Sequence, residues 1–163
     1  MSETDRLVAD ATAYSRGGHH DGALPARPGR AVAVVTCMDC RIDPALLFGL
    51  GPGEAHVLRN AGGVITDDMI RSLAISQRFL GTREIVLVHH TRCGMQGLED
   101  ERLADELEAE TGSRPPWAAG GFADPFDDVR RGVEALRIDP FIPDKSSIRG
   151  FVFDVEAGSL TEV

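Results

Sequence analysis

The sequence predicts an α/β fold, a single domain with a mainly parallel β-sheet of about four to five strands flanked by helices. Three runs of strand type, 31–36, 55–59 and 84–90, are continuously apolar. Unbroken hydrophobicity of this kind is typical of strands that are covered on both faces of a parallel sheet. Segments with helical spacing follow the second and third of these strands, as they do in α/β domains. The length of 163 residues is that of one domain with a core of useful size.

The first segment, residues 3–15, has weak helical spacing, with its few apolar residues on one side. A loop rich in Gly and Pro follows it. His19 and His20 lie in this loop, where two adjacent histidines are most simply solvated, so we assign them no role. The pattern divides the chain into an N-terminal helical arm with its loop, residues 1–28, and an α/β core, residues 29–163.

Further helices are predicted between and after the strands. Thr66 is a suitable N-cap and Gly81 a natural C-terminal stop for the best defined of them. The closing segment, 148–163, reads as strand with a turn at Ala157–Gly158. The predicted helical segments are 66–81, 96–112 and 124–137.

Charge and composition exclude several classes of partner. The chain has 17 Lys and Arg against 26 Asp and Glu, a net charge of −9, which argues against binding to nucleic acid or to an anionic membrane. No apolar run reaches the length of a membrane span, and the N-terminus lacks the apolar core of a signal peptide. We therefore expect a cytoplasmic protein. Three cysteines in a reducing compartment do not indicate a disulfide framework.

Reactive residues stand where two of the apolar runs end. The stretch VVTCMDCRID, 34–43, leads from a strand into two thiols, two carboxylates and a guanidinium, and 84–90 leads into HHTRCG. Ligands collect at the carboxyl ends of strands in open parallel sheets. If the two strands are neighbours, thiolates and an imidazole meet there, and these are ligand types that zinc favours.

Spacing alone leaves three ligand sets open. Cys37, His90 and Cys93 would form a Cys₂His site with one open position, as in catalytic zinc sites. Cys37 and Cys40 form a CxxC pair, which allows a redox function. All three cysteines with a histidine would instead close the shell and leave a structural role.

The two motifs together resemble those of the β-class carbonic anhydrases. CMDCR followed by HTRCG is similar to the Cys-x-Asp-x-Arg and His-x-x-Cys motifs that this family places around a catalytic zinc. The similarity covers about residues 30–95 and the tail SIRGFVFDVEAGSLTEV, and the short chain is similar to the compact bacterial branch. The resemblance implies a dyad of Asp39 and Arg41. The zinc ligands that it implies are Cys37, His90 and Cys93.

The resemblance also implies an enzyme, a zinc-dependent carbonic anhydrase. It would convert carbon dioxide reversibly to bicarbonate and a proton through a zinc-bound hydroxide. Asp39 would orient the hydroxide, and Arg41 would hold the Asp39 carboxylate ionised and away from the metal. With Arg41 disengaged, Asp39 would become a fourth metal ligand and close the site. An ordinary surface ion pair is the simpler alternative for these two residues.

Two other functions remain compatible with the motifs. Carbonyl sulfide and carbon disulfide hydrolases use the same zinc scaffold, and their substrates are linear and similar in size to carbon dioxide. A non-catalytic zinc-binding or CxxC redox module is the second alternative. In every enzymatic reading the partner is a small-molecule substrate. The family resemblance further implies a homodimer, or a tetramer formed from two dimers, with the N-terminal arm embracing a partner.

Strand alternation gives the remaining expectations. If alternate residues continue to face one side after the strand, Cys37, Asp39 and Arg41 project together, and Cys40 turns away into the core. His89 is expected to pack or to form hydrogen bonds on the side opposite His90. Arg92 is expected beside the ligands or facing solvent. The small residues of 59–63 would make a turn or let backbone amides approach an anion.

Overall fold

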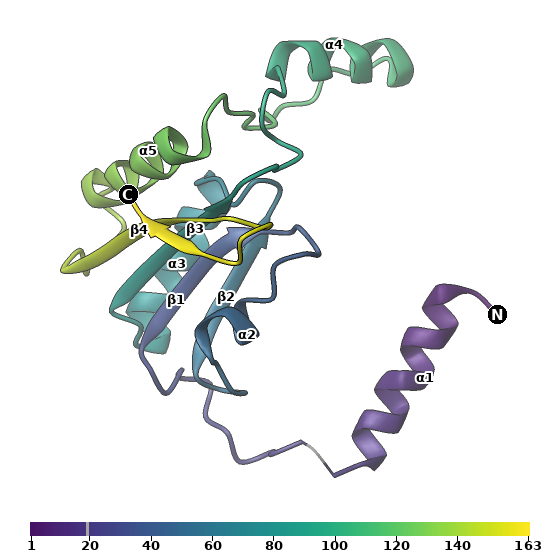
Figure 1. Ribbon diagram of the computed structural model, residues 1–163, viewed down its shortest axis with the longest axis vertical. Coiled ribbons are helices and arrows are strands. Elements are labelled where there is room, and N and C mark those ends of the chain that lie inside the picture. The colour runs from purple at the N-terminus through teal and green to yellow at the C-terminus, as the bar shows by residue number, and fades with distance from the viewer. Residues whose placement is uncertain (19) are drawn as a thin grey trace.

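A five-stranded sheet with the order β2-β1-β3-β4-β5 forms the centre of the chain (Figure 1). The computed structural model describes residues 1–18 and 20–163; His19, to which we assign no role, lies outside the described residues. The first four strands in this order are parallel, and β5 pairs antiparallel with β4. The strands are β1 (Val32–Cys37), β2 (Ala55–Asn60), β3 (Glu84–His90), β4 (Ser147–Phe153) and β5 (Leu160–Glu162). The α/β class and the mainly parallel sheet are thus confirmed.

Two helices pack together against one face of this sheet. Met69 and Leu73 of α3 share a buried cluster with Val129 and Leu136 of α5 and with alternate residues of β1, β3 and β4. Thr66 caps α3 by accepting a hydrogen bond from the backbone N–H of Met69, as its sequence predicts. The helices are α1 (Glu3–Arg16), α2 (Pro44–Phe48), α3 (Asp67–Leu80), α4 (Asp100–Thr111) and α5 (Pro125–Ile138).

The strands differ in how completely they are covered. Five of the six residues of β1 are buried, and so are five of the seven of β3, as continuous apolar runs predict. The expectation of cover on both faces is wrong for β2, which has no buried residue and leaves Val57 44% exposed. The reason is its place at the edge of the sheet, which a run of apolar residues does not reveal.

Helix boundaries depart from the sequence pattern at two places. The helix expected at 96–112 begins only at Asp100, because Gly97 has a left-handed φ of 79° and donates its N–H to the carbonyl of Phe122. The sequence pattern does not predict the short helix α2. Asp43 caps it by accepting hydrogen bonds from the N–H groups of Ala45 and Leu46. The Asp-Pro pair was a signal for a helix start, but five residues are too few to show helical periodicity after it.

A buried histidine joins the sheet to α5. His89 is 1% exposed, and its Nε2 lies 2.8 Å from Oδ2 of Asp128. Burial raises the pKa of Asp128, but the hydrogen bonds from His89 and Arg131 outweigh it, so the pKa is lowered overall. His89 also stacks on Phe122, with ring centroids 5.2 Å apart. The expectation that His89 packs and forms hydrogen bonds apart from His90 is confirmed.

Helix α1 stands away from the sheet (Figure 1). Every residue of α1 is exposed, including Leu7 at 68%, Val8 at 61% and Tyr14 at 52%. A capping box between Ser2 and Asp5 fixes its start. Among the described residues, the helices are all too short or too polar to cross a membrane.

Candidate metal centre

Parallel pairing of β1 with β3 brings the two reactive motifs together. The register sets Thr36 opposite Val88, so both strands end at the same edge of the sheet. Beyond that edge, the ligand atoms of Cys37, His90 and Cys93 all lie within 4.8 Å of one another. These side chains are 4%, 0% and 6% exposed. The structure therefore makes one compact, buried group of two sulfur atoms and an imidazole nitrogen.

The spacing of the two sulfur atoms suits a tetrahedral ion. Sγ of Cys37 lies 3.9 Å from Sγ of Cys93. Two zinc–sulfur bonds of about 2.3 Å at a tetrahedral angle separate the sulfurs by about 3.8 Å. A disulfide would need a separation of about 2.05 Å. The pair is thus placed for a shared metal ion and not for a direct bond.

The imidazole of His90 is oriented for coordination. Its Nδ1 lies 2.9 Å from the carbonyl oxygen of Thr91. Since a carbonyl can only accept, Nδ1 carries a proton, and in the neutral ring Nε2 then presents its lone pair. Nε2 is buried and has no hydrogen-bond partner among the described residues. An unpaired buried acceptor is costly, and a metal ion at this point would satisfy it.

The two thiols do not hold their protons equally. A hydrogen bond from the Cys93 thiol stabilises the Cys37 thiolate, which lowers the pKa of Cys37 although burial opposes it. The same hydrogen bond, together with burial, raises the pKa of Cys93. Cys37 is therefore the thiol of the pair that gives up its proton more readily. A bound dication would displace protons that the sulfurs still carry, so metal uptake here should release protons and weaken as the pH falls.

Asp39 and Arg41 meet in the two-point contact that the sequence predicts, but for a different reason. Strand β1 ends at Cys37, and the chain then turns, so strand alternation does not hold beyond it. Nε and Nη2 of Arg41 donate to Oδ1 and Oδ2 of Asp39 at 2.9 and 2.7 Å, and the backbone N–H of Arg41 also donates to Oδ1 at 2.9 Å. These bonds hold the pKa of Asp39 well below its usual range. Oδ2 lies 3.7 Å from Nε2 of His90, which puts an ionised carboxylate beside the three ligand atoms.

The expectation that Cys40 belongs to the core is wrong. Cys40 is exposed, because it sits in the turn after β1 and not on a continued strand. The hydrogen-bond partner of the Cys37 sulfur is Cys93. The CxxC spacing therefore does not correspond to a buried thiol pair.

Arg59 supports the chain from Cys37 to Asp39, a role that the sequence does not predict. From the neighbouring strand β2, its Nε donates to the carbonyl of Cys37 at 2.9 Å and its Nη2 to the carbonyl of Asp39 at 2.7 Å. One guanidinium thus fixes the backbone of Cys37, a candidate ligand, and the backbone of Asp39. The signal in the sequence was a charged residue near the end of an apolar strand. The sequence pattern suggested for it only a place in a turn or in an anion-binding loop.

The turn that follows Arg59 packs against the backbone of β1. Gly63 has a φ of 74°, and a Cβ placed on it would lie 2.9 Å from both the Cys37 nitrogen and the Thr36 carbonyl carbon. No side chain fits in that space. Of the two readings of 59–63, the turn is what the structure shows, and its glycine lets two backbones meet directly behind a ligand residue.

Arg92 lies between His90 and Cys93, two candidate ligand residues, and has an unusual backbone. Its φ is 55°, in the left-handed region that costs a non-glycine residue on the order of 1 kcal/mol. Its carbonyl accepts a hydrogen bond from Nη2 of Arg41 at 2.9 Å, and its own side chain faces solvent, as expected, pairing with Glu156 at 3.0 Å.

Comparison with known proteins agrees with these features. Residues 32–114 match the family model described as carbonic anhydrase. The chain is 48% identical over 163 residues to beta-carbonic anhydrase 1 of Mycobacterium tuberculosis, covering 100% of this chain and 99% of that protein. It is 34% identical to a carbon disulfide hydrolase of Acidianus, covering 80% and 76%. The crystal structure of a carbonic anhydrase from Streptococcus mutans superposes with a TM-score of 0.91 at 40% identity, covering 100% and 98%.

Gly63→Ala should disrupt the support of Cys37. The added methyl group has to displace backbone atoms of β1 and adopt a left-handed φ, so we expect the free energy of unfolding to fall by at least about 2 kcal/mol. Gly94→Ala is the matched control, since Gly94 adjoins Cys93 and a Cβ there meets no described atom within 4 Å. Its expected change is within about 0.5 kcal/mol. Urea denaturation of the metal-free proteins measures both, and equal losses would contradict this role of Gly63.

Proposed function

Because the chain belongs to the β-class carbonic anhydrase family, we propose that it catalyses the reversible hydration of carbon dioxide to bicarbonate and a proton, using one zinc ion per chain. Full-length identity of 48% to a beta-carbonic anhydrase supports this activity. In the structure, one arrangement of side chains supports this activity most strongly. Three buried donor atoms within 4.8 Å stand beside an ionised carboxylate that a guanidinium restrains.

Cys37, His90 and Cys93 would hold the zinc ion, which leaves a fourth position for water. Zinc bound there supplies a Lewis acid that makes this water acidic enough to act as a nucleophile near neutral pH. The sulfur spacing and the free lone pair of His90 Nε2 support this ligand set over one that contains the exposed Cys40. Because sulfur ligands bind a metal as thiolates, the ion would displace protons that these sulfurs still carry.

Asp39 would orient the attacking water. Because its pKa is far below neutral, its carboxylate can only accept, and its Oδ2 would accept a hydrogen bond from that water. This contact would hold the water with a lone pair toward the carbon of the substrate. Arg41 keeps the carboxylate in this role by occupying both of its oxygens, with Oδ2 2.7 Å from Nη2.

The same geometry gives Asp39 a second possible position. Its Oδ2 lies 3.7 Å from Nε2 of His90, so a modest rotation would bring it into the fourth position. Release of Arg41 would permit that rotation and exclude the water. We propose that Arg41 keeps the site open by holding Asp39 back.

Carbon disulfide hydrolysis is the competing activity. Carbon disulfide hydrolases share 31–35% identity with this chain, below the 48% shared with the mycobacterial carbonic anhydrase. Stopped-flow hydration of carbon dioxide, measured beside hydrolysis of carbonyl sulfide and carbon disulfide by the same zinc-quantified preparation, separates the two. Turnover of only the sulfur compounds would contradict the proposed function.

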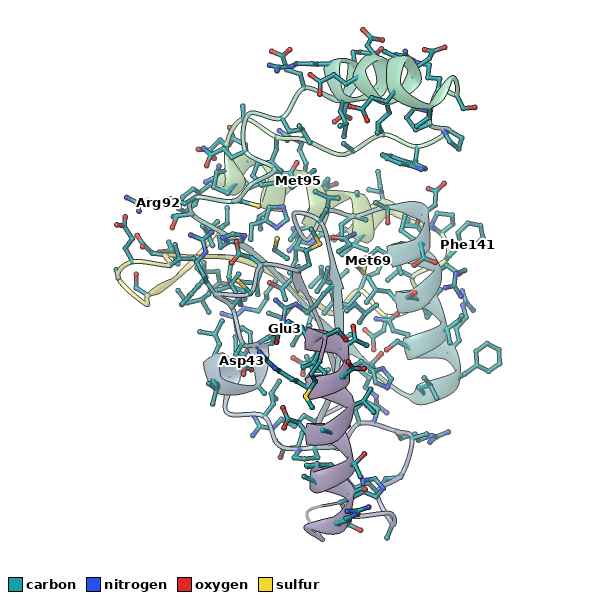
Figure 2. All side chains as sticks on the ribbon, turned by 90° about the vertical axis from the view of Figure 1, so that its right-hand side faces the viewer. Glu3, Asp43, Met69, Arg92, Met95 and Phe141 are labelled. Atoms are coloured by element: carbon teal, nitrogen blue, oxygen red, sulfur yellow. The ribbon has the colours of Figure 1, made fainter. Side chains whose placement is uncertain are left out.

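We also propose a cytoplasmic homodimer built from an arm (residues 1–28) and a catalytic core (29–163). Apolar side chains are exposed at two places in the described part of the chain that a partner could cover. One is the side of α1 that carries Leu7 and Val8; the other is near α3, where Phe79 of that helix is 72% exposed and Phe141 is 63% exposed. Figure 2 shows Phe141 projecting outward next to α3. A monomer rarely leaves such surfaces in water, and a second copy would cover them when each arm packs on its partner.

Zinc content tests the ligand set. Cys93→Ala and His90→Ala each remove a donor, so we expect them to bind well below one zinc per chain. Cys40→Ser changes an exposed thiol that contacts no ligand atom in our assignment, and it should retain about one zinc per chain. Elemental analysis after dialysis against a weak chelator measures this. Loss of zinc from Cys40→Ser with retention in His90→Ala would mean that the ligand set is wrong.

The dyad separates an enzyme from a zinc-binding module. Asp39→Asn loses the carboxylate that orients the water, and Arg41→Ala releases Asp39 toward the metal. Both proteins should keep zinc, while kcat/KM for carbon dioxide hydration falls on the order of 100-fold or more, as for other oriented catalytic hydrogen bonds. Arg102→Ala, which breaks an exposed pair on α4, is the control and should retain full activity. Zinc-replete dyad variants with wild-type turnover would favour the module.

Sedimentation velocity tests the arm. Leu7→Glu with Val8→Glu puts two charges on the apolar side of α1, and we expect these changes, like deletion of residues 1–16, to shift the protein from dimer to monomer. Ala9→Glu with Ala13→Glu adds the same charge to the other side of the helix and should leave the dimer intact. An unchanged oligomer after the deletion would remove the arm from the interface.

A further inference from the structure

Arg41 is held by two acceptors of different mobility. One is the Asp39 carboxylate, which turns about its own side-chain bonds, and the other is the backbone carbonyl of Arg92, 2.9 Å from Nη2. The side chain of Arg41 is 45% exposed, so packing does not restrain it. If the carboxylate were its only partner, the two side chains could move together. The carbonyl is the anchor that gives the pair a fixed position relative to the ligands.

The chain around Arg92 is fixed on both sides. Before it, the N–H of Thr91 donates to the carbonyl of Phe153 at 2.9 Å, and the Thr91 hydroxyl oxygen accepts from the N–H of Val155 at 3.1 Å. After it comes Cys93, a candidate ligand. Between these two points Arg92 takes up a φ of 55°. This left-handed step aims the carbonyl at Arg41, since an extended or right-handed residue would rotate the peptide plane away.

The side chain of Arg92 contributes less than its backbone. It projects to the edge of the molecule beside the turn between β4 and β5 (Figure 2) and pairs with Glu156 there at 3.0 Å. Asp154 shapes that turn by accepting hydrogen bonds from the backbone N–H groups of Glu156 and Ala157. Both members of the pair are more than 60% exposed, and such pairs contribute little. The left-handed backbone is therefore the feature that matters.

We propose that Arg92 is a positioning residue of this site: its left-handed backbone holds Arg41 on Asp39 and so keeps the fourth metal position open. The proposal rests on the proposed function, because it assumes that a metal ion binds to the three ligand residues. It predicts that the backbone preference at position 92 governs access to the metal, whereas the charge at position 92 does not.

Anion binding to the cobalt-substituted, full-length protein tests this without measuring activity. Thiocyanate entering the open position changes the visible absorption of the cobalt, and Asp39 bound in that position would compete with it. Arg92→Gly removes the charge but adopts a left-handed φ freely, so its thiocyanate affinity should stay within about twofold of wild type. Glu156→Gln should behave in the same way. Arg92→Val disfavours this backbone, and its affinity should fall about tenfold.

A double variant shows whether the effect passes through Arg41. Arg41→Ala alone should weaken thiocyanate binding, and Arg92→Val in the Arg41→Ala background should weaken it no further. If Arg92→Val does not fold, Arg92→Ala imposes a milder strain and should fall between the glycine variant and Arg41→Ala.

Three results would overturn the inference. They are wild-type affinity in Arg92→Val, additive losses in the double variant, and loss of cobalt from Arg92→Val when Arg41→Ala retains it. The last would mean that position 92 holds the ligands and not the dyad. Wild-type protein that takes up no cobalt, or whose cobalt binds no thiocyanate, would contradict the proposed function and this inference with it.

Discussion

The parallel pairing of β1 with β3 is the constraint on which the site depends. Cys37 and His90 are far apart in the chain, and they meet because the register sets Thr36 opposite Val88 and ends both strands at one edge. Ordinary main-chain hydrogen bonds thus determine the distance between a thiol and an imidazole. Burial then raises the cost of leaving these groups unpaired. The pairing both builds the metal centre and makes an empty centre unfavourable.

Around that centre, backbone groups do much of the positioning. Arg59 grips the carbonyls of Cys37 and Asp39, Gly63 lets one backbone rest on another, and the carbonyl of Arg92 receives Arg41. The guanidinium groups of Arg41 and Arg59 therefore bind backbone carbonyl groups as well as a carboxylate. Main-chain atoms are suited to this because packing and neighbouring strands already hold them in place.

Sequence reasoning reached the fold and the meeting of the two motifs, because these follow from hydrophobic runs and from the rule that parallel strands share a carboxyl edge. It failed where the path of the chain after a strand mattered. Cys40 was placed in the core by extending the alternation of β1, but the strand stops at Cys37 and Cys40 is exposed. The Asp39–Arg41 contact was predicted correctly, but from an alternation of β1 that does not continue past Cys37. Arg59 and the backbone of Arg92 escaped notice because tertiary contacts, and not local pattern, give them their partners.

The order of the site residues along the chain has a consequence during synthesis of the protein. Part of the cover of the three candidate ligand residues follows them in the chain, since Phe122 and Phe153 pack into the cluster that contains Cys37 and Cys93. A ribosome adds about 5–20 residues per second, so the two thiols are synthesised seconds before their cover. During that interval they are open to oxidants as well as to metal ions. Damage to this centre by oxidation is thus a hazard of synthesis more than of the finished protein.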